Sequence, residues 1–421
     1  MRSVTVEQGP RFGTVPAPAS KSETIRFLLA AALGTNPVRI EGVLFSKDVL
    51  AMTECITAMG AKVKREDDSV VVTPGPVPDR EIIFPCSESA AVFRIMIAVA
   101  GAKGLTARFL REGRLPERPF QPYRGELESH GMIIREEGTD VLVSGKLTPG
   151  RYTLPGNISS QFVTGLAMAL PLLEKESLIF VRFPIESRPY IRMTLRTVFS
   201  AGLHLSEELP DDGIILVART GYSYQLPPRV RVEKDWSSSA AFLMAGAVSS
   251  KGITVTGLSK ESLQGDRKII GILKEMGAEV NVEDGAVTVK KGVLKGIEAD
   301  FKDMPDILPM AAVLASAAEG ESVLKGASRL RMKESDRLKG TADLLHSLGA
   351  DVTETEDGLV IRGGKPLSGG IVSVYSDHRL VMAAALAACL SESPVMIDDA
   401  DAADKSFPGF FEDWERLERI G

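Results

Sequence analysis

The stretch GILKEMGAEVNVEDGAVTV, Gly271–Val289, combines apolar residues at helical spacing with two alternating runs. Gly277 follows the last helical position and fits a left-handed helix end, and EDG fits a hairpin turn between two strands. The chain repeats this order of helix, strand, turn and strand. Close copies are Glu54–Val72 and Asp343–Ile361, and looser copies are Gly125–Val143 and Thr197–Val217.

A second pattern lies between these copies. Each example begins with small polar residues and continues into an apolar helix, with a Ser, Asp or Asn at the start that can cap it. Six stretches follow this pattern: PASKSETIRFLLAAALG (18–34), PCSESAAVFRIMIAVAG (85–101), PGNISSQFVTGLAMALPLL (155–173), KDWSSSAAFLMAGAVSS (234–250), DMPDILPMAAVLASAAEG (303–320) and YSDHRLVMAAALAACLS (375–391). The C-terminal FFEDWERLERIG (410–421) is expected to be a sixth copy of the first pattern, docked without its strands.

The two alternating patterns predict an α/β fold of six β-α-β-α-β-β units of about 70 residues each. Ala-rich helices recur by chance in α/β proteins, but the fixed order of both patterns argues against chance. Because 421 residues exceed one ordinary core, we expect three repeats with buried helices in each of two domains. Gly and Pro near Gly13–Pro16 and Pro227–Glu233 mark the crossings. The domains expected are residues 14–230 and a discontinuous domain of 1–13 plus 231–421.

The composition argues against several classes of protein. The net charge of −6 disfavours a nucleic-acid binder, which normally carries a basic surplus. The three cysteines stand far apart without a C-x-x-C pair and the four histidines do not cluster, so neither a disulfide framework nor a metal site is expected. The first residues lack the apolar run of a signal peptide, and the Ala-rich stretches are too short to span a membrane. A cytoplasmic protein is expected.

The polar helix starts predict an anion-binding site. Helix N-termini carry unpaired N–H groups and partial positive charge. If three starts in each domain point the same way, a cleft between facing domains gathers six of them. Cations near the helix starts and in the adjoining loops add positive charge, although at this density many cations are simply solvated. These cations are Lys21, Arg26, Arg94, Arg114, Arg118, Arg188, Arg331, Lys333, Arg337, Arg379 and Lys405. The sequence favours a ligand with two or more phosphate or carboxylate groups.

Short motifs stand in order from one end of the chain to the other. They are SKSETIRF (20–27), LPERPF (115–120), NISSQF (157–162), SRPY (187–190), MPD (304–306), RMKESDRL (331–338), DHR (377–379) and KSFPGFF (405–411). In this order they resemble the EPSP synthase family, the 3-phosphoshikimate 1-carboxyvinyltransferases. The resemblance implies the inside-out α/β barrel of enolpyruvyl transferases, closing around shikimate 3-phosphate and phosphoenolpyruvate without metal or cofactor. It further implies a monomer in chorismate and aromatic amino acid biosynthesis.

The reaction implied is an addition followed by an elimination. The 5-hydroxyl of shikimate 3-phosphate loses a proton, the methylene of phosphoenolpyruvate gains one, and phosphate then leaves. Asp306 matches the family's proton acceptor, and its position also fits a plain N-cap for residues 307–317. Glu334 is the candidate for the methylene proton, with an ordinary salt-bridge or capping carboxylate as the alternative. Lys21 is expected to touch both ligands and to relay protons.

The resemblance also implies two sets of binding residues. Shikimate 3-phosphate is assigned Lys21, Ser22, Arg26, Ser159, Ser160, Gln161, Ser187, Asp306 and Lys333. Phosphoenolpyruvate is assigned Lys21, Ala90, Arg118, Gln161, Arg337, Arg379 and Lys405. Serines at a helix start offer hydroxyl and backbone N–H groups together, and the arginine fork matches carboxylate or phosphate; each serine can also be only a cap. Tyr190 fits either the shikimate ring or the core, and His378 is interpreted as mainly structural.

One segment departs from the family pattern. Many bacterial relatives have Asn-Ala-Gly-Thr where this chain has Glu88-Ser89-Ala90-Ala91. Ala90 then replaces a glycine that lets backbone approach phosphoenolpyruvate closely. We hypothesise that the extra methyl group reduces sensitivity to glyphosate, the inhibitor that occupies this pocket in the family.

Three alternatives compete with this interpretation. UDP-N-acetylglucosamine enolpyruvyl transferases share the fold but typically carry a cysteine in the region of Arg111–Phe120, and REGRLPERPF has none. RNA 3′-phosphate cyclases share part of the architecture, but the expected histidine nucleophile and the acidic charge balance disfavour them. A non-enzymatic repeat scaffold does not need Lys21, Asp306 and Glu334 beside five phosphate-ready cations.

Overall fold

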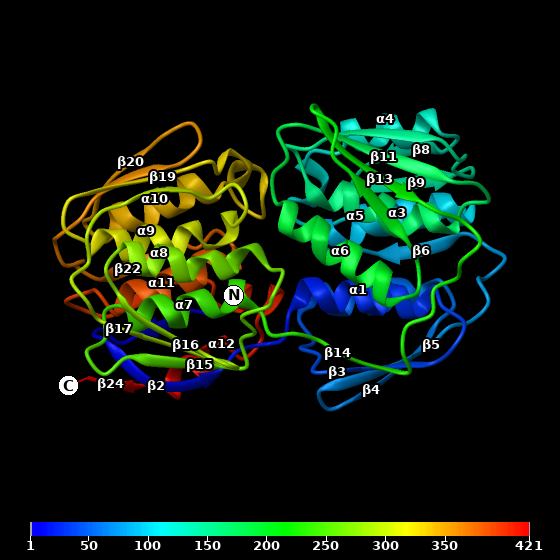
Figure 1. The fold of residues 1–421 in the computed structure, drawn as a ribbon. Helices are drawn as coiled ribbons and strands as arrows, with labels where there is room; N and C mark the ends of the chain where they lie inside the picture. Colours follow the sequence, from blue (N-terminus) through cyan, green and yellow to red (C-terminus); the bar gives the residue numbers. More distant parts are fainter. Residues whose placement is uncertain (1, 421) are drawn as a thin grey trace. The chain divides into compact units, whose positions relative to one another are not determined.

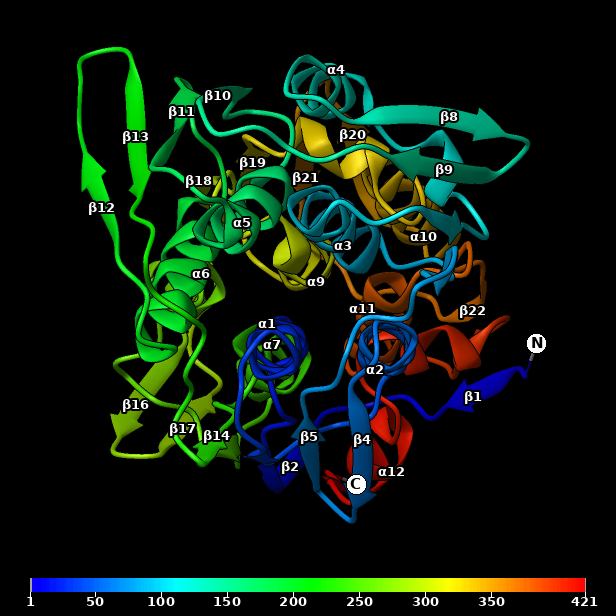
Figure 2. The same ribbon diagram turned by 90° about the vertical axis from the view of Figure 1, so that its right-hand side faces the viewer.

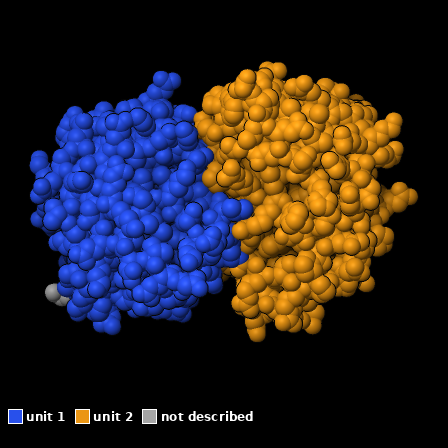
Figure 3. Space-filling model, viewed as in Figure 1, with its two compact units in different colours: residues 1–18, 233–421 blue, residues 19–232 orange. Residues whose placement is uncertain are grey.

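The chain divides into two compact units. The computed structural model describes residues 2–420. Unit 1 comprises Met1–Pro18 and Glu233–Gly421, and unit 2 comprises Ala19–Val232 (Figure 3). The first crossing therefore lies five residues after the expected one. Strand β2 (Arg11–Pro16) is the reason, because it pairs in parallel with β15 (Ile253–Thr256) as far as Pro16. The second crossing lies two residues later than expected, because β14 (Arg229–Arg231) pairs with β3 (Val38–Glu41) of unit 2.

Unit 2 contains three repeats, each with its own four-stranded sheet (Figure 1). In the second and third repeats the first two strands are parallel and flank a buried helix, and in all three repeats a hairpin pairs antiparallel with the strand after the buried helix. The first repeat is α1 (Lys21–Ala32), β3, α2 (Lys47–Ala58), β4 (Lys62–Glu66) and β5 (Ser69–Thr73). The second is β6 (Ile82–Pro85), α3 (Ala90–Lys103), β7 (Ala107–Leu110), α4 (Gln121–Ser129), β8 (Ile133–Glu137) and β9 (Asp140–Ser144). The third is β10 (Arg151–Pro155), α5 (Ser160–Ala169), β11 (Ser177–Arg182), α6 (Arg188–Ser200), β12 (Leu205–Glu208) and β13 (Gly213–Ala218).

Unit 1 repeats the arrangement with more 3₁₀ turns. Its first repeat is β2, α7 (Trp236–Gly246), β15, α8 (Ile269–Glu275), β16 (Glu279–Glu283) and β17 (Ala286–Lys290). The second is β18 (Glu298–Asp300), α9 (Leu308–Ser316), β19 (Glu321–Lys325), α10 (Arg337–Ser347), β20 (Asp351–Glu354) and β21 (Leu359–Arg362). The third is β22 (Gly370–Val372), α11 (His378–Ala388), β23 (Val395–Ile397), α12 (Phe410–Glu415) and β24 (Glu418–Arg419).

Next to each crossing between the units, a sheet contains a strand from a distant part of the sequence. The buried helix α1 opens unit 2 without a strand before it, and β14, at the far end of that unit, supplies the missing parallel neighbour of β3. In the same way β2 supplies the parallel neighbour of β15 for the repeat of α7. The repeats adjoining the crossings are thus completed by residues distant in sequence.

The last repeat of unit 1 departs from the expectation for the C-terminus. Its sheet has three strands, and β1 (Val4–Val6) takes the antiparallel place beside β23 that a hairpin strand fills elsewhere. The C-terminal segment is not wholly without a strand, because β24 pairs with β2 at Arg11 and Phe12. A strand from the N-terminus therefore substitutes for the sixth hairpin.

The repeated apolar helices form the cores of the units. In α3, α7, α9 and α11 nearly every side chain is buried, as expected for helices that are apolar on all sides. In unit 1, α7, α9 and α11 pack against one another, and in unit 2 α3 packs against α5. Figure 2 looks along several of these helices almost end-on, with strands lying outside them.

Five of the six buried helices have the expected side-chain caps. The caps are Ser20, Ser89, Ser159, Asp235 and Asp377, each accepting a hydrogen bond from a backbone N–H of the first turn. The exception is α9, which continues a 3₁₀ turn over Pro305–Ile307 and has no side-chain cap. The expectation that Asp306 caps this helix is therefore wrong, and its carboxylate is available for other contacts.

Candidate functional site

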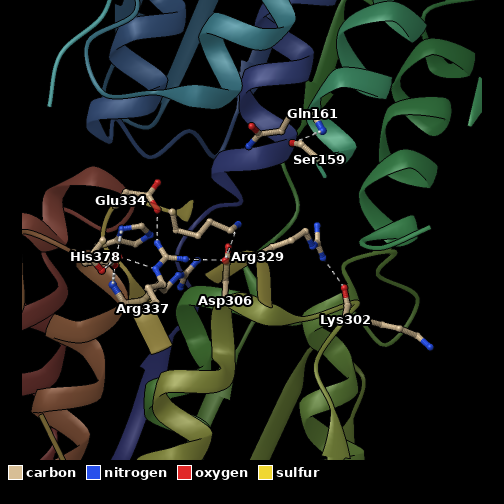
Figure 4. A network of polar contacts seen from close by, with 12 residues as sticks. Ser159, Gln161, Lys302, Asp306, Arg329, Glu334, Arg337 and His378 are labelled. Atoms are coloured by element: carbon tan, nitrogen blue, oxygen red, sulfur yellow. Dashed lines mark hydrogen bonds and ion pairs between the residues drawn. The ribbon is translucent and has the colours of Figure 1, made fainter. Parts of the chain in front are cut away.

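Asp306 lies at the centre of a network of charges in unit 1 (Figure 4). Its Oδ1 atom accepts a hydrogen bond from Lys333 Nζ at 3.2 Å and another from Arg337 Nη1 at 2.8 Å. The Asp306 side chain keeps 23% exposure, so a ligand can still reach the carboxylate. Lys333 and Glu334 come from the turn between a 3₁₀ helix (Ser328–Met332) and α10, which places the KESDR motif against the start of α9.

The surrounding charges keep Asp306 ionised. Burial alone would raise its pKa, but the charges of Lys333, Arg337 and Arg379 outweigh burial and the repulsion by Glu334. The pKa of Asp306 is therefore held well below its usual value. An ionised carboxylate accepts hydrogen bonds and protons but donates none.

Arg337 joins three carboxylates. Its Nη1 bonds Asp306, its Nη2 bonds Glu334 Oε2 at 2.6 Å, and its Nε bonds Asp377 Oδ2 at 2.7 Å. Burial favours a lower pKa for Arg337, but the three carboxylates raise it far above its usual value. Three of the five N–H donors of the guanidinium are thus used inside the protein. Arg337 orients both candidate proton-transfer carboxylates, a role that the sequence did not reveal.

The guanidinium of Arg379 has unused hydrogen-bond donors. It follows the cap Asp377, whose Oδ1 accepts from the backbone N–H of Arg379 at 2.9 Å. Its guanidinium is buried, its Nη1 meets only the sulfur of Met382 at 3.7 Å, and its Nε has no hydrogen-bond partner among residues 2–420. A buried cation with unused donors is costly unless an acceptor arrives, which points to an anionic ligand.

Left-handed backbone precedes three helices in the site segments. Ser187 before α6 has a φ of 53°, Ser87 before α3 has 49°, and Tyr375 and Ser376 before α11 have 48° and 53°. Residues other than glycine rarely adopt such angles, and when they do the position is often functional. No sequence signal marks these positions, because none of them is glycine.

Lys21 and Asp48 form an ion pair in unit 2. Lys21 is the first residue of α1, and its Nζ donates to Asp48 Oδ2 at 2.9 Å. The Lys21 side chain is 19% exposed and that of Asp48 is 7% exposed. The ammonium group is thus held in place while one side of it stays open. Sequence reasoning missed Asp48, which lies in a separate helix without a motif.

Arg26 is enclosed by protein oxygens. Its Nε bonds Thr194 Oγ1 at 2.9 Å, its Nη1 bonds the carbonyl of Ser22 at 2.6 Å, and its Nη2 bonds Thr164 Oγ1 and the carbonyl of Tyr190, both at 3.2 Å. Burial lowers its pKa to about 10. Arg26 therefore ties α1 to α5 and α6, and most of its donors are already used.

The start of α5 brings further predicted residues together. Ser159 caps this helix, Ser160 and Ser159 are nearly buried, and Gln161 is half-buried. Arg94 of α3 bonds both Ser159 and Gln161. The sequence noted Arg94 only as one cation among several. Figure 4 shows Ser159 and Gln161 among the labelled side chains.

Other predicted residues lie at helix ends. Ala90 is the first residue of α3 and is buried, and Arg118 follows a 3₁₀ turn over Leu115–Glu117 and is also largely buried. Lys405 ends a 3₁₀ helix over Ala400–Lys405 and is 4% exposed. His378 is buried beside Asp377, with 3.7 Å between its Nδ1 and Asp377 Oδ1. The structure thus divides the predicted residues between the units. The unit 1 set is Asp306, Lys333, Glu334, Arg337, Arg379 and Lys405, and the unit 2 set is Lys21, Ser22, Arg26, Ala90, Arg118, Ser159, Ser160, Gln161 and Ser187.

Two features concern the described residues as a whole. Among residues 2–420, no three His, Cys, Asp or Glu side chains are grouped so that they could hold a metal ion. Within the same residues, no helix is both long enough and apolar enough to cross a membrane.

Known proteins resemble the chain over nearly its whole length. The family model described as EPSP synthase (3-phosphoshikimate 1-carboxyvinyltransferase) matches residues 7–414. A 3-phosphoshikimate 1-carboxyvinyltransferase from Methanocorpusculum labreanum is 37% identical over 412 residues, covering 96% of each chain. One from Clostridium kluyveri is 34% identical over 420 residues, covering 99% of this chain and 97% of the relative.

Solved structures share the fold. EPSP synthase from Acinetobacter baumannii superposes with a TM-score of 0.81 at 23% identity, covering 100% of both chains. The enolpyruvyl transferase NikO from Streptomyces tendae gives 0.80 at 17% identity, covering 99% of this chain and 98% of the other. The predicted fold class, an enolpyruvyl transferase-like α/β fold, is therefore confirmed.

Proposed function

Because the chain belongs to the EPSP synthase family, we propose that it transfers the enolpyruvyl group of phosphoenolpyruvate to the 5-hydroxyl of shikimate 3-phosphate. The products are 5-enolpyruvylshikimate 3-phosphate and phosphate, and the reaction is a step towards chorismate and the aromatic amino acids. We further propose that the enzyme acts as a monomer in the cytoplasm.

The observation that carries this proposal is the state of Asp306. Its carboxylate is ionised and partly exposed, does not cap helix α9, and is oriented by Lys333 and Arg337. A general base needs these properties: it must be deprotonated, reachable and fixed in direction. In the proposed addition step, Asp306 accepts the proton of the 5-hydroxyl as its oxygen bonds to the central carbon of phosphoenolpyruvate.

Glu334 fits the second proton transfer. Its Oε2 is held by Arg337 at 2.6 Å and its side chain is 15% exposed. In the addition, the proton from Glu334 goes to the methylene carbon of phosphoenolpyruvate, with Lys21 as the alternative donor. In the elimination, the bond between the central carbon and the phosphate oxygen breaks, and the methyl group formed in the addition loses a proton to Glu334, which restores the double bond. One carboxyl group can serve both steps because it ends the first one deprotonated.

The remaining residues are proposed to hold the two anions. Shikimate 3-phosphate is assigned to Lys21, Ser22, Arg26, Ser159, Ser160, Gln161, Ser187, Asp306 and Lys333. Phosphoenolpyruvate is assigned to Lys21, Ala90, Arg118, Gln161, Arg337, Arg379 and Lys405. The buried Nε of Arg379 supports the second assignment directly, since an incoming carboxylate or phosphate satisfies it. Arg26 is the weakest member, because protein oxygens occupy most of its donors.

The test is a coupled phosphate-release assay with the full chain. With phosphoenolpyruvate present, phosphate release is expected with shikimate 3-phosphate and not with UDP-N-acetylglucosamine. Release with the UDP-sugar alone overturns the proposed acceptor, and release with neither acceptor overturns the proposed reaction.

A further inference from the structure

Arg94 stands where three segments of the unit 2 set meet. It belongs to the second turn of α3 and is 4% exposed. Its guanidinium carbon lies 4.8 Å from the centre of the Phe162 ring, so the aromatic face of α5 fixes the plane of the guanidinium. Its Nη2 donates to the carbonyl of Pro119 at 2.8 Å, next to Arg118. The side chain thus links α3, the start of α5 and the segment that carries Arg118.

Arg94 determines how the hydroxyl of Ser159 is used. The Oγ atom accepts a hydrogen bond from Arg94 Nη1 at 3.2 Å and another from the backbone N–H of Gln161 at 3.2 Å. A hydroxyl has two acceptor sites and one proton. Both acceptor sites are occupied, and among residues 2–420 no hydrogen bond has Ser159 Oγ as its donor. The remaining capacity of Ser159 is a single O–H that can only donate.

Arg94 also fixes the orientation of the Gln161 side-chain amide. Arginine carries donors and no acceptor, so the atom of Gln161 that faces it must be the carbonyl oxygen. This contact is 3.0 Å from Arg94 Nη1 to Gln161 Oε1. The Nε2 group is then directed to the other side of the amide, and within the described chain it has no hydrogen-bond partner. On the side away from Arg94, Gln161 therefore presents its Nε2 group, which can only donate.

Together these contacts make the start of α5 selective for negative oxygen. Serine and glutamine side chains ordinarily both donate and accept hydrogen bonds. Here Ser159 offers one donor and Gln161 offers two, and the positive end of helix α5 adds to them. The three oxygens that Arg94 bonds in these contacts are neutral. A phosphate or carboxylate oxygen, which only accepts hydrogen bonds, matches this arrangement. The proton of a ligand hydroxyl would face donors there.

We propose that Arg94 is a positioning residue that presents the hydroxyl of Ser159 and the Nε2 group of Gln161 to the substrate as hydrogen-bond donors. It need not touch the substrate, because it acts through these two side chains. The inference rests on the proposed function in one respect, namely that Ser159 and Gln161 contact shikimate 3-phosphate.

The first experiment measures shikimate 3-phosphate affinity by calorimetry. Arg94→Met is expected to weaken binding at least about tenfold, because both partners regain rotational freedom and their donor-only orientation is lost. Arg94→Lys, which keeps the charge but not the planar fork, is expected to give an intermediate loss. Arg111→Met is the matched control. Arg111 is equally buried and lies 5.4 Å from Phe93, but its nitrogens bond Thr139 and Glu136 at the β8–β9 hairpin, so affinity should change less than about twofold.

A double-mutant cycle separates positioning from simple structural support. If Arg94 acts through Ser159, the affinity lost in Ser159→Ala is at least about threefold smaller when Arg94→Met is already present. Additive losses contradict the inference. Equal losses of affinity in Arg94→Met and Arg111→Met contradict it as well.

Gln161→Glu keeps the inference testable even if Arg94→Met does not fold. The new carboxylate pairs with Arg94 and supplies no donors to the ligand. We expect Tm to hold or rise while affinity for shikimate 3-phosphate falls at least about tenfold. A parallel fall in Tm and affinity, or unchanged affinity, overturns the inference. Failure of the wild-type chain to release phosphate would instead overturn the proposed function, so the two failures are distinguishable.

Discussion

The unit 1 set and the unit 2 set contain similar numbers of cations but balance them differently. In unit 1, Arg337 is bonded to three carboxylates, and Lys333 shares one of them. In unit 2, the bonds of Arg26 and those described for Arg94 go to hydroxyl, amide and carbonyl oxygens. Carboxylates under tight charge control suit proton transfer, whereas cations held by neutral oxygens keep a positive field for an anion. We therefore expect the two sets to differ in emphasis. The carboxylates of unit 1 are expected to serve proton transfer, and cations of both units are expected to bind the two anions.

Asp306→Asn should have the largest effect. The amide keeps the shape of the carboxylate but cannot accept a proton, so kcat should fall by about 10²–10⁴-fold while KM changes little. Steady-state phosphate release measures both constants. Asp303→Asn is the control, because Asp303 lies three residues earlier and its one ion pair among residues 2–420 is with the exposed Lys268. Equal losses in the two variants would contradict the role given to Asp306.

Removing the central arginine of each set tests their difference in charge balance. Arg337→Met leaves three carboxylates close together and should lower the free energy of unfolding by about 3–5 kcal/mol. Arg26→Met leaves neutral oxygens without a donor and should cost about 1–3 kcal/mol. Urea denaturation at pH 7 measures both values.

The pH dependence of these losses sharpens the test. Without Arg337, the clustered carboxylates have raised pKa values, so the folded state gains protons as pH falls and the deficit of Arg337→Met should shrink towards pH 4. The deficit of Arg26→Met should shrink less, since its hydrogen-bond partners are neutral and Glu23 acts on it only through its charge. A constant deficit in both variants would mean that the carboxylates of unit 1 are not coupled.

Lys333→Met should shift the acid limb of the rate profile. In the wild-type chain the pKa of Asp306 is depressed, so Asp306 loses its function as a base only below its ordinary pKa of 3.8. Removing the lysine charge raises the pKa of Asp306, and the acid limb of kcat/KM should move to higher pH. Lys339→Met is the control, because Lys339 pairs with Asp343 on an exposed face. An unshifted limb in Lys333→Met would show that another group sets it.

Ala90→Gly should have the smallest effect on turnover and a selective effect on inhibition. The buried methyl group is removed at the first residue of α3, so glyphosate should inhibit at a concentration about tenfold lower. Inhibition curves for the two proteins at equal phosphoenolpyruvate concentration provide the measurement. No gain in sensitivity would refute the hypothesis.

The repeats were predictable because their signals are local. The spacing of apolar residues, the glycine after each helix and the polar starts all lie within a few residues of one another. The strands exchanged at the crossings were not predictable, because β14 and β2 join sheets whose other strands are distant in sequence. The same is true of β1, which takes the place of a hairpin strand.

The site was predictable in its residue types and less so in their relations. Motifs pointed to Asp306, Glu334 and Lys333, but the local sequence around Asp306 suggested a cap that it does not form. The bridging role of Arg337 and the contacts of Arg94 depend on three-dimensional packing between segments. No periodicity or motif reports such contacts.

The central claim is that Asp306 in unit 1 serves proton transfer, whereas Ser159 in unit 2 serves the binding of shikimate 3-phosphate. The most direct test compares the calorimetric Kd for shikimate 3-phosphate in Asp306→Asn and Ser159→Ala with the kcat of each variant. The account predicts a Kd within about threefold of wild type and a collapsed kcat for Asp306→Asn, and a Kd weakened about tenfold with a much smaller loss of kcat for Ser159→Ala. Parallel losses of affinity and turnover in both variants would contradict it.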